Sequence, residues 1–233
     1  MRNIAIILAG GMGSRMGGGM PKQLLPLADG QTILEHSVAA FEQAECIDEI
    51  GIVMHPDYIA RAEEMLLRNG WQKVAFIIGG GKERRESSIN AVRKIEQQMG
   101  KFDGGATICG QSVNVLLHDA ARPFVSQRII SDVCEALTQH EAVTVAIPAT
   151  DTMYTTDGDF VQNIPLRSTL MCAQTPQAFR LDVIARAYAL AQQDPNWQST
   201  DDCGVVRRYL PDTPIYIVPG DSANRKITYR EDI

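Results

Sequence analysis

The glycine-rich segment 8–22, which carries two basic residues, is the part of the sequence best suited to bind phosphate. It reads Leu-Ala-Gly-Gly-Met-Gly-Ser-Arg-Met-Gly-Gly-Gly-Met-Pro-Lys. Glycine has no side chain, so backbone N–H groups in such a loop can approach phosphate oxygens closely. Arg15 can donate paired hydrogen bonds to a phosphate, and Lys22 supplies a compact positive charge. These residues predict a loop that grips the triphosphate of a nucleotide.

Two other phosphate-binding loops do not match this segment. The dinucleotide fingerprint needs a glycine three residues after Gly13, where this chain has Met16, so an NAD-dependent oxidoreductase is disfavoured. The Walker A pattern needs Gly-Lys-Ser/Thr, but Lys22 stands between Pro21 and Gln23. From the local pattern alone, a glycine-rich surface turn without a ligand stays open.

Three later segments also have residue types suited to nucleotide chemistry. They are Gly-Gly-Lys-Glu-Arg-Arg-Glu-Ser at 80–87, His-Asp-Ala-Ala-Arg-Pro at 118–123 and Asn-Arg-Lys-Ile-Thr at 224–228. A carboxylate such as Asp119 at a strand end can hold Mg²⁺ beside a triphosphate. His118 has no partner in its motif, which favours a structural role for it. The ordinary alternatives are a helix start at 80–87 and an ion pair that braces the turn at 118–123.

Buried strands that alternate with amphipathic helices must position these segments. Short apolar runs predict strands at 4–9, 50–54, 74–78, 113–117, 142–147 and 215–218. Apolar residues at helical spacing predict helices around 34–41, 59–66, 89–95, 129–137 and 181–191. This order predicts an α/β fold: a Rossmann-like, mainly parallel twisted sheet with helices on both faces. Such sheets bind ligands at the carboxyl ends of their strands, where the glycine-rich loop and the two segments after strands fall.

The pattern changes after Pro148. An Asp-Gly pair within Thr-Asp-Gly-Asp separates the β-prone runs 151–154 and 160–162, which predicts a hairpin. We expect residues 149–168 to form an arm that projects from a single domain spanning 1–233 and that contacts a second subunit in a homodimer.

The composition excludes several classes of protein. Hydrophobic residues make up 45% of the chain and charged residues 21%, as in soluble globular proteins. The net charge of -6 disfavours binding to nucleic acid, and no apolar run is long enough for a membrane span. The five cysteines are scattered without a Cys-x-x-Cys pair, which argues against a disulfide framework or a zinc site. With no targeting segment visible, we expect a cytoplasmic protein with reduced thiols.

Taken together, these motifs resemble the polyol-phosphate cytidylyltransferases, nucleotidyltransferases that act on 2-C-methyl-D-erythritol 4-phosphate or on ribitol 5-phosphate. The resemblance rests on Leu-Ala-Gly-Gly-Met-Gly-Ser-Arg-Met-Gly followed by Met-Pro-Lys-Gln, and on His-Asp-Ala-Ala-Arg-Pro. It implies a nucleotide site made of Leu8, Ala9, Gly10, Gly11, Gly13, Gly81, Arg84, Ser87, Asp119 and Ala120. It implies catalytic roles at the α-phosphate for Arg15, Lys22 and Lys226, and a Mg²⁺ ion at Asp119. The polyol phosphate is expected to contact Asp151, Thr152 and Arg167, partly across a dimer, with Arg122 shaping its site.

The resemblance implies that a cytidylyl group passes from CTP to 2-C-methyl-D-erythritol 4-phosphate with release of pyrophosphate, in non-mevalonate isoprenoid precursor synthesis. No catalytic triad is visible, and none is needed, because the attacking phosphate oxygen is already anionic. The alternative substrate is ribitol 5-phosphate, which would give CDP-ribitol. The Leu-Ala-Gly-Gly and Met-Pro-Lys-Gln spellings lean towards the ribitol enzymes, whereas His-Asp-Ala-Ala-Arg-Pro leans towards the erythritol enzymes. A non-catalytic nucleotide-binding module is a further alternative, disfavoured because Lys22 and Lys226 are both present.

Overall fold

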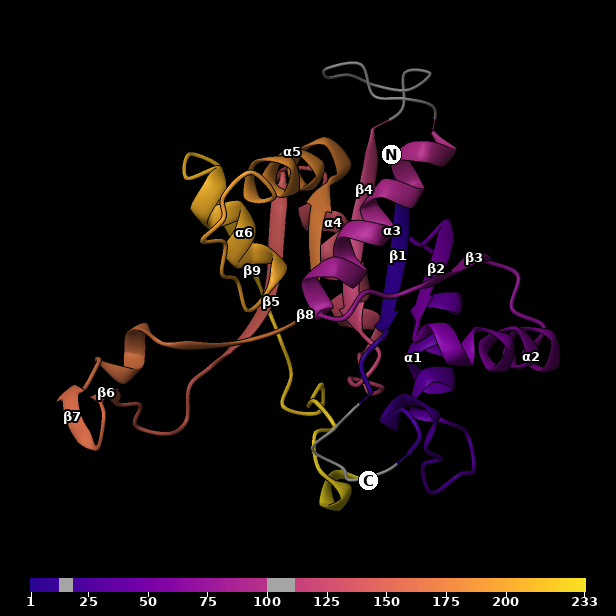
Figure 1. Ribbon diagram of the computed structural model, residues 1–233, viewed down its shortest axis with the longest axis horizontal. Helices are drawn as coiled ribbons and strands as arrows, with labels where there is room; N and C mark the ends of the chain where they lie inside the picture. Colours follow the sequence, from indigo (N-terminus) through magenta and orange to yellow (C-terminus); the bar gives the residue numbers. More distant parts are fainter. Residues whose placement is uncertain (13–18, 100–111) are drawn as a thin grey trace.

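The computed structural model describes residues 1–12, 19–99 and 112–233. Within these residues, seven strands form one sheet in the order β3-β2-β1-β4-β8-β5-β9 (Figure 1). Pairing is parallel between β3, β2, β1 and β4 and between β5 and β9, whereas β8 runs antiparallel to both of its neighbours. The strands are β1 (Arg2–Ala9), β2 (Glu49–Met54), β3 (Val74–Gly79), β4 (Val113–Asp119), β5 (Ala142–Pro148), β8 (Met171–Arg180) and β9 (Ile215–Pro219). The predicted mainly parallel α/β sheet is therefore confirmed.

Helices cover both faces of this sheet. One face packs against α1 (Ile33–Glu42), α2 (Ile59–Asn69) and α4 (Gln127–Ala136). The other face packs against α3 (Arg84–Gln98), α5 (Leu181–Ala191) and α6 (Asp202–Tyr209). Among the described residues, no helix combines the length and the apolar character that a membrane crossing requires.

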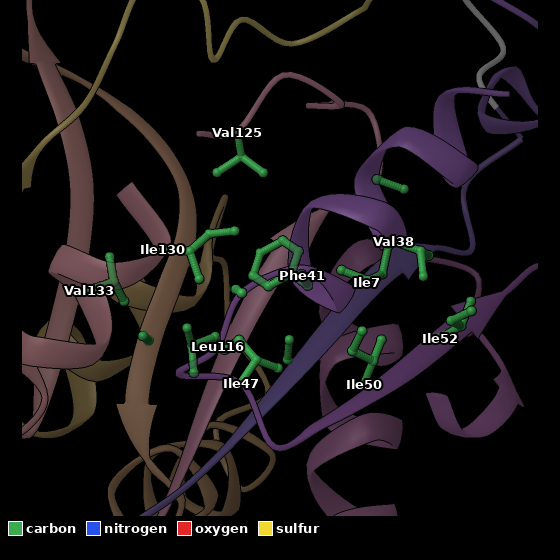
Figure 2. Packing of buried hydrophobic residues seen from close by; sticks show 14 of the residues in the cluster. Ile7, Val38, Phe41, Ile47, Ile50, Ile52, Leu116, Val125, Ile130 and Val133 are labelled. Carbon is green, nitrogen blue, oxygen red and sulfur yellow. The ribbon is translucent and has the colours of Figure 1, made fainter. Parts of the chain in front are cut away.

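Strand β1 shows why the predicted strands are apolar at successive positions and do not alternate between apolar and polar residues. Its odd-numbered apolar residues, such as Ile7, face α1, and its even-numbered residues, such as Ile6, face α3. Figure 2 shows Ile7 packed with Val38 and Phe41 of α1 and with Leu116 of β4. Because both sides of the strand are covered, every position must be apolar. This burial fixes the end of β1, and therefore the start of the glycine-rich loop.

Strand β8 was not predicted, although it lies in the middle of the sheet. It joins β4 to β5, and its polar residues Gln174, Thr175 and Gln177 are buried. Proline cannot donate to a strand ladder, so Pro176 within this run argued against a central strand. The buried polar side chains instead form hydrogen bonds that hold the active site, as described below.

The predicted hairpin is present, but its first strand begins later than expected. It consists of β6 (Thr155–Asp157) and β7 (Phe160–Asn163), whereas the sequence suggested a strand from residue 151. Gly158 in the turn has φ +54°, a conformation that favours glycine. The hairpin projects away from the sheet (Figure 1). Large apolar side chains on and around it are exposed.

Candidate active site

A cavity of about 330 Å³ opens at the carboxyl edge of the sheet, where β1, β3 and β4 end. Five separate chain segments meet in it. Of the residues singled out in the sequence, it brings together Leu8, Gly10, Gly11, Lys22, Gly81, Arg84, Ser87, Asp119 and Lys226. Ala9 and Ala120 are fully buried beside it. Gly13 and Arg15 lie outside the described residues.

The wall of the cavity depends on the absence of side chains at two glycines. A Cβ atom on Gly10 would lie 2.9 Å from Ser87 Oγ, and one on Gly80 would lie 2.8 Å from the same oxygen and 3.1 Å from the Cα of Gly10. The loop after β1 and the loop after β3 therefore touch each other, with Ser87 between them. Ser87 Oγ also accepts a hydrogen bond from the backbone N–H of Gly81 at 3.2 Å. The geometry requires both loops to be glycine-rich.

Lys22 is held in place by its neighbour and by the C-terminal segment. Gln23 is buried, and its Nε2 donates to the carbonyl oxygens of Ala9 at 2.6 Å and Gly11 at 2.7 Å. This brace ties the far end of the glycine-rich loop to the end of β1. Lys22 Nζ donates to the carbonyl oxygen of Ile227 at 2.5 Å. The loop and the C-terminal segment therefore present Lys22 and Lys226 to the same cavity.

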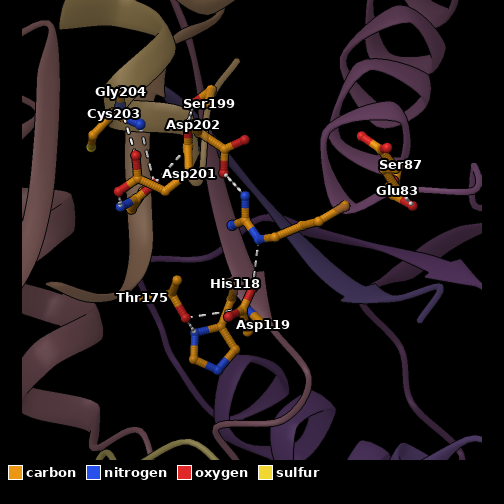
Figure 3. Close-up of polar contacts among 12 residues, drawn as sticks. Glu83, Ser87, His118, Asp119, Thr175, Ser199, Asp201, Asp202, Cys203 and Gly204 are labelled. Carbon is orange, nitrogen blue, oxygen red and sulfur yellow. Dashed lines mark hydrogen bonds and ion pairs between the residues drawn. The ribbon is translucent and has the colours of Figure 1, made fainter. Parts of the chain in front are cut away.

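A chain of alternating charges runs through the floor of the site. Asp119, at the end of β4, accepts from Lys226 Nζ at 2.7 Å through one oxygen and from Arg84 Nε at 2.8 Å through the other. The same guanidinium reaches Asp202 at 2.8 Å through Nη1. Figure 3 shows Asp119 at the end of β4 and Asp202 at the start of α6, joined through the guanidinium between them. Four segments that are distant in sequence are thus fixed to one another by ion pairs.

These ion pairs keep Asp119 and Arg84 charged. Burial disfavours the ionised form of Asp119, but Arg84 and Lys226 more than offset it and hold the pKa of this carboxyl well below its ordinary value. Burial likewise opposes the charge on Arg84, and Asp202 and Asp119 raise the pKa of the guanidinium above its ordinary value. Asp119 is therefore a carboxylate at neutral pH.

The cavity is positively charged although the chain as a whole is acidic. Its described lining carries four basic side chains, Lys22, Lys82, Arg84 and Lys226, and two acidic ones, Glu83 and Asp119. The chain has a net charge of -6, so the basic residues are concentrated here. A site of this kind attracts anions.

Asp202 supports the site from behind and was not singled out as a site residue. It is buried, and its carboxylate accepts a hydrogen bond from the Tyr188 hydroxyl at 2.5 Å. Its backbone N–H donates to Gln177 Oε1 at 3.0 Å, and Gln177 Nε2 donates to Asp201 Oδ2 at 2.7 Å. Thr-Asp-Asp at 200–202 was the only signal for this group in the sequence, and its link to Arg84 depends on tertiary structure.

His118 has a structural role, as the sequence suggested. It is completely buried, and its Nε2 lies 3.0 Å from the carbonyl oxygen of Arg122. A carbonyl only accepts, so Nε2 carries the proton and Nδ1 accepts from the Thr175 hydroxyl at 3.1 Å. Thr175 Oγ1 in turn accepts from the backbone N–H of Asp119 at 3.1 Å (Figure 3). This relay fixes the turn at 119–122.

Burial also lowers the pKa of His118 to about 4, from 6.5 in the unfolded chain. As the pH falls through this window, the unfolded chain binds a proton that the folded protein cannot bind, so stability is lost. Lowering the pH from 7 to 5 should therefore reduce the free energy of unfolding by about 2 kcal/mol through His118. Urea denaturation of wild type and His118→Gln at both pH values measures this contribution. An identical pH dependence in the two proteins would contradict it.

Arg122 holds the C-terminal segment and does not line the cavity. Its Nη1 donates to the carbonyl oxygen of Asn224 at 2.8 Å, and its Nη2 donates to that of Ala173 at 3.2 Å. The Ile227 N–H donates to the carbonyl oxygen of Ala121 at 2.8 Å, so two bonds hold the segment that carries Lys226. Arg122 therefore acts on the site by positioning this segment.

Arg225, next to Lys226, points elsewhere. Its guanidinium carbon lies 5.1 Å from the centre of the Phe124 ring, and its Nη2 donates to the carbonyl oxygen of Asp232 at 3.1 Å. Arg225 is absent from the described lining of the cavity, whereas Lys226 belongs to it. In this extended segment the side chains of Arg225 and Lys226 therefore point to opposite sides, Lys226 to the cavity and Arg225 to Phe124.

The three expected polyol contacts in the arm are not brought into the cavity of the same chain. Asp151, Thr152 and Arg167 are absent from its described lining and lie at the base of the projecting arm. Arg167 Nη1 instead donates to the carbonyl oxygen of Thr150 at 3.2 Å.

The donor set fits a Mg²⁺ ion that arrives with a nucleotide. Among the described residues, no cluster of three or more His, Cys, Asp or Glu side chains could hold a metal by itself. Asp119 offers one carboxylate in the cavity, and both of its oxygens accept from cations. Mg²⁺ commonly takes only one or two carboxylates and fills its other positions with phosphate oxygens and water.

Comparisons with known proteins agree with these motifs. The IspD family model, 2-C-methyl-D-erythritol 4-phosphate cytidylyltransferase, matches residues 3–233. The chain is 46% identical over 237 residues to the protein of that name from Thermobifida fusca, covering 100% of this chain and 90% of that protein. It is 38% identical over 234 residues to the bifunctional ribulose 5-phosphate reductase/CDP-ribitol pyrophosphorylase Bcs1 of Haemophilus influenzae, covering 100% of this chain but 47% of that protein. Among solved structures, 4-diphosphocytidyl-2C-methyl-D-erythritol synthase from Anaerococcus prevotii superposes with a TM-score of 0.80 at 26% identity, covering 99% and 92% of the two chains.

Proposed function

We propose a function for this site that follows from the family of the chain. The chain belongs to the 2-C-methyl-D-erythritol 4-phosphate cytidylyltransferase family. The protein transfers a cytidylyl group from CTP to 2-C-methyl-D-erythritol 4-phosphate and releases pyrophosphate, a step of non-mevalonate isoprenoid precursor synthesis. The observation that carries the account is the Lys226–Asp119–Arg84 chain in a basic cavity lined by glycine-rich loops.

The reaction is a displacement at the α-phosphorus of CTP. A phosphate oxygen of the polyol attacks that phosphorus, and the bond to the β-phosphate oxygen breaks to release pyrophosphate. The attacking oxygen is already anionic, so no general base is required. The neutral, buried His118 agrees with this, because it has no path for accepting a proton from a substrate. The barrier comes from bringing two anions together, and fixed cations lower it.

Each group that lines the cavity is assigned a separate part of the substrate. Lys22 and Lys226 are assigned to the α-phosphate, where negative charge grows in the transition state. The backbone around Gly10 and Gly11 is assigned to the triphosphate, and Gly81 and Ser87 to the base. Arg84 orients Asp119, to which it is bound at 2.8 Å. Arg15 is assigned to the α-phosphate, with Lys22 and Lys226, through its motif alone.

Asp119 is the proposed protein ligand of Mg²⁺. When bound with CTP, the ion would neutralise charge on the phosphate oxygens and orient them. For Asp119 to reach it, one carboxylate oxygen must be shared between Mg²⁺ and the cation that it accepts from in this structure. We also assign the reaction to the cytoplasm, with which the free thiols of the four described cysteines are consistent.

The arm is proposed to mediate a homodimer and to carry Asp151, Thr152 and Arg167 to the partner's cavity. Its support is the apolar surface of the arm, which one chain leaves exposed. Phe160 is 80% exposed, and the other exposed large apolar residues of this region are Met153, Tyr154, Val161, Ile164, Leu166 and Met171. Several exposed large apolar side chains on one segment are typical of an interaction site.

Phe160→Glu should therefore convert the dimer to a monomer and lower kcat/KM for the polyol phosphate. The charge would be buried against an apolar partner surface, which is unfavourable. Leu67→Glu is the matched control, because Leu67 on α2 is 82% exposed and lies away from the arm. Sedimentation velocity and steady-state kinetics provide the two readouts. A wild type that sediments as a monomer at micromolar concentration would exclude this proposal.

The alternative substrate, ribitol 5-phosphate, is favoured by the Leu-Ala-Gly-Gly and Met-Pro-Lys-Gln spellings and by the similarity to the Haemophilus influenzae protein. Pyrophosphate release with CTP and each polyol phosphate in turn distinguishes the two. We expect kcat/KM to be at least roughly 10-fold higher for 2-C-methyl-D-erythritol 4-phosphate, since a pocket discriminates by about this factor for one small group. A preference for ribitol 5-phosphate would reassign the substrate, and binding of CTP without turnover on either would reassign the protein as a nucleotide-binding module.

A further inference from the structure

Two cysteines, Cys46 and Cys134, meet at the edge of the sheet opposite the active site. Cys46 lies in the connection between α1 and β2, and its carbonyl oxygen accepts from the Asn3 side chain at 2.8 Å near the start of β1. Cys134 lies in the last turns of α4. The active-site cavity is at the other end of β1.

Each sulfur atom lies near the backbone of the element that carries the other cysteine. Cys46 Sγ lies 3.9 Å from the carbonyl oxygen of Ile130 on α4, and Cys134 Sγ lies 4.0 Å from the carbonyl oxygen of Cys46. The α1–β2 connection and α4 are therefore in contact at these two cysteines. Both are free thiols in this structure.

The surroundings make the two thiols unequal. The hydrogen bond from Cys134 lowers the pKa of Cys46 to about 7 against the effect of burial; nearby Lys73 lowers it further, and Asp48 opposes this. The same contact, with burial, raises the pKa of Cys134 well above its ordinary value. Cys46 is half-buried, whereas Cys134 is buried. An accessible sulfur that ionises near neutral pH therefore lies against a second, protected thiol, as in pairs of attacking and resolving cysteines.

We propose that Cys46 and Cys134 form a reversible disulfide when the protein meets hydrogen peroxide. The Cys46 thiolate attacks one peroxide oxygen, the O–O bond breaks, and the departing hydroxide takes a proton to become water. The Cys134 sulfur then attacks the resulting sulfenic acid, the S–O bond breaks, and the departing hydroxide leaves as water with the Cys134 proton. Two thiols are oxidised to one disulfide while one peroxide is reduced to two waters, and a thiol reductant restores both cysteines.

The bond would tie the α1–β2 connection to α4 and leave the cavity untouched. A cross-link between positions far apart in sequence restricts the unfolded chain. The oxidised protein should therefore melt roughly 5–10 °C higher than the reduced protein. Its kcat should stay within about twofold, since a cross-link at the opposite edge removes no charge from the positions that stabilise the transition state.

The test is a peptide map of full-length protein treated with hydrogen peroxide, then alkylated under denaturing conditions and analysed by mass spectrometry. We expect a linked pair of peptides containing Cys46 and Cys134, and a fall from five alkylated thiols to three that dithiothreitol reverses. Cys109→Ser is the matched control and should form the same link. Cys134→Ser should form none and should leave a Cys46 sulfenic acid that dimedone traps.

The wild-type map decides the outcome even if Cys134→Ser folds poorly. Retention of all five thiols in treated protein, or links that involve other cysteines in place of this pair, would overturn the proposal. So would a link between Cys46 and Cys134 that appears only when the protein is oxidised after denaturation.

Discussion

Lys226→Ala is expected to fold normally and to lower kcat by about 10²–10³, the usual cost of removing one group that stabilises transition-state charge. Lys226 lines the cavity, and its Nζ is fixed 2.7 Å from Asp119. Loss of this ammonium leaves Asp119 paired with Arg84, so no buried charge is orphaned and stability should change little. Lys22→Ala should behave in the same way, because Lys22 faces the cavity from the opposite loop.

Arg225→Ala is the control for this experiment. It removes a cation of the same segment that contacts Phe124 and Asp232 and does not belong to the described lining of the cavity. Its kcat should stay within about threefold of wild type, because it removes no charge from the transition state. Steady-state pyrophosphate release and thermal unfolding of all three variants give the comparison. Equal kcat values for Lys226→Ala and wild type would remove Lys226 from the mechanism.

Asp119→Asn is expected to reduce both stability and turnover. The substitution keeps the shape of the side chain but removes the charge that pairs with Arg84 and Lys226. Breaking a buried pair in this way costs about 3 kcal/mol of the free energy of unfolding. Lys226 also loses its anchor, and a displacement of roughly 1 Å from the reacting position costs about 10² in rate.

The matched control is Asp132→Asn, which makes the same change in an exposed ion pair with Arg128 on α4. Such pairs contribute at most about 1 kcal/mol, so stability and kcat should stay close to wild type. Urea denaturation and kinetics over a range of Mg²⁺ concentrations provide the readouts. If Asp119 binds the ion, Asp119→Asn should also need more Mg²⁺ for half-maximal rate. An unchanged Mg²⁺ dependence would remove Asp119 as a ligand while leaving its ion pairs in place.

The sequence predicted the parts of this protein that depend on local patterns. The strands β1, β2 and β4 are buried apolar runs because helices cover both of their sides. Their order along the chain implied that the loops after β1, β3 and β4 would meet at one edge. Gly10 and Gly80 were recognisable in the sequence as loop-forming residues. The structure adds that both positions need glycine, because a Cβ atom at either one would lie too close to Ser87 Oγ.

What the sequence did not predict depends on contacts between distant residues. Strand β8 contains Gln174, Thr175 and Gln177, so its sequence is as polar as that of a loop. These side chains are nevertheless buried, because they form hydrogen bonds inside the protein. The sequence did not predict the role of Asp202, since its partners, Arg84 and Tyr188, come from two other helices. Arg122 was expected at the substrate, but the carbonyl groups that it holds became evident only once the chain was folded. Periodicity indicates which side of an element is buried and does not indicate its partners.

Transfer of the α-phosphate is the most direct test of the central claim. The protein is incubated with Mg²⁺, 2-C-methyl-D-erythritol 4-phosphate and CTP labelled with ³²P at either the α- or the γ-position, and the products are separated by chromatography. Label from the α-position should move to a cytidine diphosphate conjugate of the polyol, and label from the γ-position should move to pyrophosphate. Label from the γ-position in the polyol product, or no polyol product at all, would contradict the account.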